Sequence, residues 1–159
     1  MERTGKYLTF FVVEEFGVAV LKVREIMGLQ QITELSGRPR WMKGILNLRG
    51  KVVSVVDLRR KFDFPEQEPT QQTCIIVVQI GIGYDLIGLI VDAVSEVINL
   101  FEDDVLLVST SEPQGVVGIT KTKPSTGRAR RVVMLLDLEK VFTPEDIAAL
   151  TFMNAKNTV

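Results

Sequence analysis

An internal repeat is the feature of this sequence that most restricts its fold. Residues 52–62, VVSVVDLRRKF, and residues 132–142, VVMLLDLEKVF, share Val-Val, Asp-Leu and the final Phe in register. In each copy an apolar run predicts a buried strand, and the Asp that follows can cap a short helical turn. A chain that carries the same unit twice is expected to fold as two halves of similar plan.

A second match precedes each copy of this unit. Residues 17–25, GVAVLKVRE, and residues 88–96, GLIVDAVSE, share a Gly, two Val and a Glu at the same positions. Residues 63–72, DFPEQEPTQQ, are polar, contain two prolines and separate the repeats like a linker. The extra length of the second half falls in the polar loop 121–131, KTKPSTGRARR.

Short strands with few helices fill most of the chain. Alternation predicts a hairpin over residues 7–20 that turns at Glu14-Glu15, and residues 21–27 fit both a helical turn and a strand. We expect a helical turn there, followed by a strand near residues 28–33. The further expected strands are residues 45–48, 52–56, 73–80 and 84–91.

Helical turns are expected after the Asp of each repeated unit and at the end of the chain. In the first unit Leu58 and Phe62 share one face, while Arg59, Arg60 and Lys61 are expected to point to water. Residues 143–146, TPED, have the hydroxyl cap, early proline and acids of a helix start. Residues 154–159 are expected to form a frayed tail.

The composition excludes several kinds of functional site. The chain has no histidine and one cysteine, Cys74, so a zinc site, a Ser-His-Asp triad, a Cys-His pair and an internal disulfide are not expected. Cys74 opens the apolar run CIIVV and is interpreted as a small buried hydrophobic residue in a reducing compartment. There is no phosphate-binding GK[ST] motif, and Glu102-Asp103-Asp104 fits a solvated turn better than a metal site. We expect no catalysis, cofactor or metal.

Charge and hydropathy restrict the partners. A net charge of −1 gives no overall field for nucleic acid, whereas 46% hydrophobic residues leave apolar side chains for interfaces. Residues 1–6 do not open a signal peptide, and the apolar stretch 74–91 contains Gln79, Asp85 and a Gly-Ile-Gly turn, which favours two strands over a membrane span.

The run GILNLRGKVVSVVDLRRKF, with YLTFFVVEEFGVAVLKVREIMGLQQIT before it and GLIVDAVSEVINL after it, resembles the CheW-like domain family of bacterial chemotaxis. The resemblance covers residues 7–150 as a single domain, with the repeat boundary near residues 63–72. It implies a mainly β fold of two SH3-like five-stranded β-barrel subdomains that share a hydrophobic core, with short helices and a C-terminal helix.

The same resemblance implies a function. Members are non-catalytic scaffolds or adaptors that couple the cytoplasmic tips of methyl-accepting chemotaxis receptors to the regulatory domain of the histidine kinase CheA. We therefore expect a cytoplasmic protein at the inner face of the membrane, held there through receptor arrays, without nucleic acid binding or membrane insertion of its own. The alternative is a small β-barrel module that binds nucleic acid or a small ligand.

The receptor-binding candidates come from family positions, and the kinase-binding residues stay unknown. They are Val23, Glu25, Gly44, Asn47, Arg49, Gly88, Val94 and Val97. Most of these are ordinary core or turn residues on composition alone. Glu25 recurs as Glu96, so a structural role is at least as good an explanation.

Arg49 is the candidate that we single out. When residues 44–49 are aligned with residues 115–120, Arg49 is replaced by Thr120, so the shared scaffold does not require the cation. A guanidinium in a turn can bind carboxylates in a fixed geometry. The basic residues of the 121–131 loop, Lys121, Lys123, Arg128, Arg130 and Arg131, are interpreted as a solvated loop.

Overall fold

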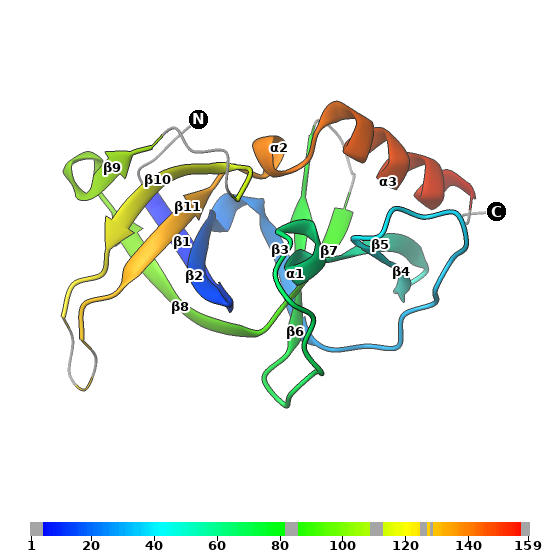
Figure 1. The fold of residues 1–159 in the computed structure, drawn as a ribbon, viewed down its shortest axis with the longest axis horizontal. Coiled ribbons are helices and arrows are strands. Elements are labelled where there is room, and N and C mark those ends of the chain that lie inside the picture. Colours follow the sequence, from blue (N-terminus) through cyan, green and yellow to red (C-terminus); the bar gives the residue numbers. More distant parts are fainter. Residues whose placement is uncertain (1–4, 82–85, 109–112, 125–126, 128, 157–159) are drawn as a thin grey trace.

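The fold consists of two β-sheets that lie side by side, with helices at their junction and along one edge (Figure 1). The computed structural model describes residues 5–81, 86–108, 113–124, 127 and 129–156. One sheet has six strands in the order β8-β1-β2-β11-β10-β9, and the other has five in the order β3-β6-β7-β5-β4. The expected mainly β fold of two packed units is confirmed, but one of the two sheets has six strands where five were expected.

The strands and helices follow the chain in a regular order. The strands are β1 Gly5–Val12, β2 Glu14–Ala19, β3 Val23–Gly28, β4 Met42–Leu48, β5 Lys51–Asp57, β6 Cys74–Gln79, β7 Leu86–Val91, β8 Ala93–Leu100, β9 Val105–Leu107, β10 Val116–Lys121 and β11 Val132–Leu136. The helices are η1 Val20–Lys22, α1 Leu58–Lys61, η2 Glu102–Asp104, α2 Leu138–Val141 and α3 Pro144–Lys156.

The two halves interleave, because each sheet takes strands from both. β2 of the first half runs parallel to β11, with Gly17 opposite Leu135. β7 of the second half runs parallel to β5, with Gly88 opposite Val55. These pairings are equivalent under the sequence repeat, so the repeat is a structural one.

The hairpin register corrects part of the repeat alignment. Gly44 lies opposite Val55, and Gly118 lies opposite the equivalent Leu135, each beside a register shift in its strand. The counterpart of Gly44 is therefore Gly118, and the alignment of residues 44–49 with 115–120 was wrong by three residues. Two glycines, Gly115 and Gly118, precede β11 in the sequence, and only the strand pairing shows which of them corresponds to Gly44.

A backbone hydrogen bond supports the corrected register. The Asp57 amide donates to the Trp41 carbonyl, and the Asp137 amide donates to the Gly115 carbonyl, so Trp41 and Gly115 are equivalent. Counting forward by the same number of residues from Trp41 and from Gly115, the counterpart of Arg49 is Lys123 rather than Thr120. Both halves therefore carry a cation at this position.

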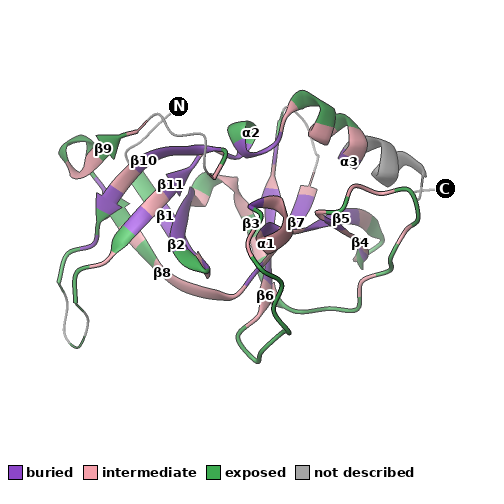
Figure 2. Ribbon diagram, in the orientation of Figure 1, coloured by how far each residue is buried: buried purple, intermediate pink, exposed green. Residues whose placement is uncertain are grey.

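The main core lies between the sheets, where buried segments of both meet (Figure 2). It is rich in aromatic rings. Phe16 contacts Phe10 and Phe62, with ring centroids 6.1 and 5.2 Å apart, and Trp41 contacts Phe142 at 5.9 Å. Phe62 and Phe142, the last residues of the two repeated units, are both buried in this core. Cys74 is half-buried against it, and burial raises the pKa of its thiol.

Two local predictions near the N-terminus were wrong. The first hairpin turns at Val13, which has a φ of 65°, so Glu14 and Glu15 belong to β2. Glu15 is buried and accepts hydrogen bonds from Arg131, an anchor that sequence spacing does not reveal. The helical turn η1 ends before Val23, and the following strand is β3 rather than residues 28–33.

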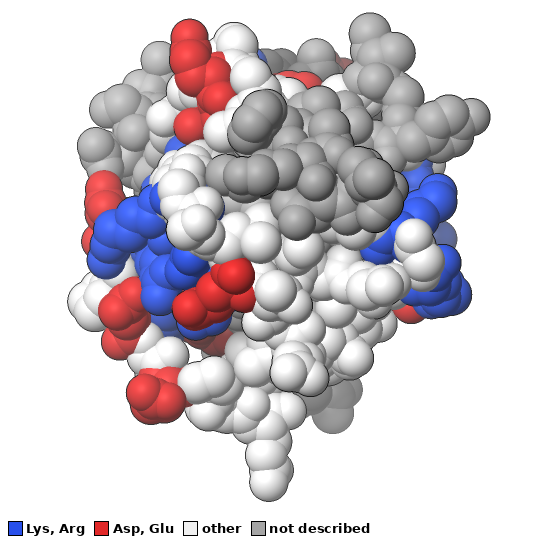
Figure 3. Space-filling model, turned by 90° about the vertical axis from the view of Figure 1, so that its right-hand side faces the viewer, with Lys and Arg blue, Asp and Glu red and all other residues white. Residues whose placement is uncertain are grey.

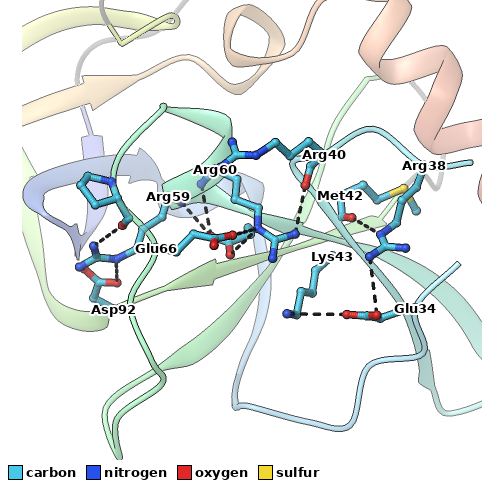
Figure 4. Close-up of polar contacts among 11 residues, drawn as sticks. Glu34, Arg38, Arg40, Met42, Lys43, Arg59, Arg60, Glu66 and Asp92 are labelled. Carbon is cyan, nitrogen blue, oxygen red and sulfur yellow. Dashed lines mark hydrogen bonds and ion pairs between the residues drawn. The ribbon is translucent and has the colours of Figure 1, made fainter. Parts of the chain in front are cut away.

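The three cations of α1 do not point freely to water. Arg59 is held by Asp92 at 2.7 Å, Arg60 by Glu66 at 2.6 Å (Figure 4), and Lys61 by Asp146 of α3 at 3.2 Å. These partners come from the turn between β7 and β8, from the linker and from α3, and a local helical pattern cannot show them. The caps were predicted correctly, since Asp57 accepts from the Arg59 amide and Asp137 from the Glu139 amide.

The C-terminal helix begins with a reciprocal cap. The Thr143 hydroxyl accepts from the Asp146 amide, and the Asp146 carboxylate accepts from the Thr143 amide. The helix docks on β5, where the Ser54 hydroxyl donates to the Leu150 carbonyl. It includes residues 154–156, which the sequence assigned to a frayed tail, and residues 157–159 lie outside the described part.

We predict that Phe62→Ala and Phe142→Ala each lower the free energy of unfolding by about 3 to 5 kcal/mol, because each truncation leaves a cavity in the shared core. Denaturant melts measure both losses. Phe101→Ala is the matched control, because Phe101 is exposed and its loss costs within about 0.5 kcal/mol. A silent Phe62 or Phe142 variant would contradict a shared core.

Candidate partner-binding surface

Glu25 and Arg49, both predicted from the sequence, form an ion pair at the surface. Glu25 lies on β3, one edge of the five-stranded sheet, and Arg49 lies in the turn that joins β4, the opposite edge, to β5. Arg49 donates to both carboxylate oxygens, with N–O distances of 3.1 and 2.6 Å. The pair therefore connects the two edge strands of one sheet.

The local backbone presents Arg49 to solvent. The Asn47 side chain accepts from the Gly50 amide at 2.9 Å, which closes the turn. Arg49 has a φ of 51°, and its side chain is 73% exposed against 30% for Glu25. Asn47, the other predicted residue at this turn, therefore shapes it and is itself exposed.

The ion pair shifts both pKa values. Hydrogen bonds from Arg49 lower the pKa of Glu25, and those to Glu25 raise the pKa of Arg49. A carboxyl whose pKa is lowered on folding stabilises the fold above its unfolded pKa and loses that contribution as pH falls through the folded pKa. The pair is therefore ionised at neutral pH.

Gly44 and Gly88 serve packing. A Cβ at Gly44 would lie 2.2 Å from the Thr33 carbonyl oxygen, and one at Gly88 would lie 3.0 Å from Ile75. Both glycines are buried, so neither presents a side chain or an exposed backbone to a partner. Gly44 and Gly88 can therefore act on a partner only indirectly, by keeping the backbone beneath the surface closely packed.

The valine candidates lie on the two outer strands β3 and β8, which belong to different sheets. Val23 and Val94 are half-buried and pack against the main core. Val97 is 52% exposed, and its counterpart in the repeat is Ile26, which is 46% exposed beside Glu25. Ile26 was missed from the sequence, although extending the repeat 17–25/88–96 by one residue pairs it with Val97.

A cavity of about 680 Å³ lies away from these residues, between the linker and the loop that follows β3. Three cations line it, and each is paired within the chain: Arg59 with Asp92, Arg60 with Glu66, and Lys43 with Glu34 (Figure 4). None of the predicted site residues lines this cavity.

Within the described residues, no group of three or more Cys, Asp and Glu could hold a metal ion. None of the helices in the described part is both long and apolar enough to cross a membrane. The face on the α3 side carries charges at its flanks around an uncharged middle (Figure 3). The described surface thus combines an exposed ion pair with exposed aliphatic side chains on two packed sheets.

Comparisons with known proteins identify the kind of binding protein. Residues 6–146 match the CheW-like domain, and the chain belongs to this family of non-catalytic chemotaxis scaffolds. It is 32% identical to the chemotaxis protein CheW of Klebsiella aerogenes over 92% of this chain and 87% of that one, and 34% identical to CheW of Bacillus subtilis over 72% and 70%.

A solved structure agrees with the fold. The crystal structure of the scaffolding protein TtCheW from Thermoanaerobacter tengcongensis superposes with a TM-score of 0.75 at 31% identity. The match covers 87% of this chain and 92% of that one.

We predict that Gly44→Ala lowers the free energy of unfolding by about 1 to 3 kcal/mol, because the added methyl collides with the Thr33 carbonyl. Gly28→Ala is the control, since a Cβ there meets nothing within 4 Å and should stabilise by about 0.4 to 1 kcal/mol. Equal melts for the two variants would contradict the packing role.

We also predict that Arg49→Gln raises the pKa of Glu25 toward its ordinary value of 4.5, because the variant lacks the charged hydrogen-bond donor. Carboxyl ¹³C shifts followed from pH 2 to 7 measure this pKa. Lys51→Gln, in the same turn, should leave the pKa unchanged. A Glu25 pKa that is the same in wild type and Arg49→Gln would show that the pair does not form in solution.

Proposed function

We propose that this protein is an adaptor that couples the cytoplasmic tips of methyl-accepting chemotaxis receptors to the regulatory domain of the histidine kinase CheA. Membership of the CheW-like family and the match to a scaffolding protein support this role. The adaptor works at the cytoplasmic face of the membrane, where receptor arrays hold it. The observation that carries the receptor side is the exposed Glu25–Arg49 pair beside Ile26.

The geometry of Arg49 suits recognition of a receptor surface. A guanidinium has five N–H donors, and Glu25 engages two of them. The remaining donors can bind carboxylates or carbonyl oxygens, while Glu25 holds the fork in place. Ile26 and Val97 add exposed aliphatic area, which a partner can bury.

The position of β3 supports transmission between the partners. β3 follows η1 directly, and Lys22 of η1 pairs with Glu139 of α2 at 2.9 Å. A partner that shifts β3 therefore also acts on η1. The Lys22–Glu139 ion pair connects η1 to α2, which follows β11 of the six-stranded sheet. In this proposal receptor state reaches the kinase as altered packing between the two sheets.

Nucleic acid is a poor alternative partner. The net charge is −1, and the cations of α1 are paired within the chain. Nucleic acid binding depends on free cations that track phosphates.

Arg49→Glu tests the proposal. The substitution faces solvent and should shift the melting temperature by no more than about 2 °C. Affinity for a receptor cytoplasmic fragment should fall by more than about tenfold, because like charges then face each other across the contact. Affinity for the kinase regulatory domain should be unchanged, since we place the kinase surface elsewhere.

Lys51→Glu is the matched control, because it makes the same charge change in the same turn. It should bind the receptor fragment within about threefold of wild type, as expected for a charge outside the contact. If Arg49→Glu folds normally and binds the receptor fragment as wild type does, Arg49 is a solvated turn residue and the receptor surface lies elsewhere.

A further inference from the structure

A second cavity, of about 330 Å³, lies beside β8 and β10 of the six-stranded sheet. Its walls come from the end of β8, from η2, and from β10 with the residues that follow it. The lining residues are Glu96, Ile98, Asn99, Leu100, Phe101, Asp104, Thr120, Lys121, Thr122 and Lys123.

This cavity occupies the position in the second half that the Glu25–Arg49 pair occupies in the first. Glu96 is the repeat counterpart of Glu25, and the hairpin register makes Lys123 the counterpart of Arg49. The same framework therefore presents a cation near a strand glutamate twice. The two copies differ in what that cation meets.

In the first half the carboxylate partner of Arg49 comes from its own chain. In the second half Arg131 holds the equivalent Glu96 and also binds Glu15, with an N–O distance of 2.7 Å to the latter. This arrangement diverts Glu96 away from Lys123. The Lys123 ammonium instead lies 5.8 Å from the centre of the exposed Phe101 ring.

The cations of this cavity are available to a ligand. Neither Lys121 nor Lys123 has a carboxylate partner among the residues that the structure describes. The polar groups of the wall are already engaged: the Thr120 hydroxyl donates to the Asp104 carbonyl, the Thr122 hydroxyl accepts from the Arg131 amide, and the Asp104 carboxylate accepts from the Phe101 amide.

We propose that this cavity is a second binding site, which takes an acidic side chain next to a large apolar side chain of a peptide segment in a partner protein. The carboxylate takes the place beside Lys123 that Glu25 takes beside Arg49, and the apolar side chain packs on Phe101 and Ile98. The volume is at the lower end of ligand pockets and suits one or two side chains.

The charges favour a peptide over a polyanion. Lys121 and Lys123 stand beside Asp104 and the paired Glu96, so the rim carries both signs. A single carboxylate can sit on the lysine side of such a rim. Nucleic acid or an anionic membrane would bring further negative charge onto the acidic side, where like charges repel.

The test uses the full chain and a defined library of octapeptides, each with one Glu beside one Phe, Leu or Ile, together with a twin library that has Gln for Glu. We expect the wild-type protein to retain peptides from the Glu library only. The best peptide, labelled with fluorescein, should bind Lys123→Gln about tenfold more weakly by anisotropy, as expected for the loss of one charged hydrogen bond.

Lys51→Gln is the control, because it removes an exposed cation outside this cavity and should bind the labelled peptide like wild type. This outcome is independent of whether the receptor surface lies at Arg49. No retained peptide, equal retention of the Gln library, full affinity of Lys123→Gln, or displacement of the peptide by single-stranded DNA or phosphatidylserine vesicles would overturn the proposal.

Discussion

The parallel pairing of β2 with β11 and of β5 with β7 is the constraint on which the rest of this structure depends. Each pairing brings a glycine of one half against a strand of the other. A Cβ at Gly17 would lie 3.3 Å from Val133, and one at Gly88 would lie 3.6 Å from Val55, so both glycines keep the packing close. Because the halves are interleaved through these pairs, neither half contains a complete sheet, and the aromatic core belongs to both.

Interleaving also determines where the two proposed binding surfaces lie. The outer strand β3 is joined to the five-stranded sheet through β6, a strand of the second half, and β8 is joined to the six-stranded sheet through β1, a strand of the first. A partner on either outer strand therefore meets a surface built by both halves. The repeat supplies the same framework twice, and the two cations in it differ in their surroundings. Arg49 is paired with Glu25, whereas Glu96, the counterpart of Glu25, is paired with Arg131.

Several features were predictable because they depend on neighbours in the chain. The Asp57 and Asp137 caps and the Thr143 helix start are local, and hydrogen bonds between nearby residues decide them. The Glu25 and Arg49 candidates came from family positions, and their pairing came only from the structure. Gly44 and Gly88 entered as binding candidates and proved to be packed residues, because a close approach between distant segments leaves no trace in local pattern.

The sequence by itself determined that this protein is a β protein of two repeated halves, that it belongs with chemotaxis scaffolds, and that its caps and buried aromatics lie where the repeat puts them. The tertiary structure alone decided which residues meet. It aligned Gly44 with Gly118, paired Arg59 with Asp92 and Lys61 with Asp146, and paired Glu96 with Arg131 rather than with Lys123. The physical reason is that strand propensity and helix capping act over a few residues, whereas strand register and ion pairs are chosen by packing between segments far apart in the chain.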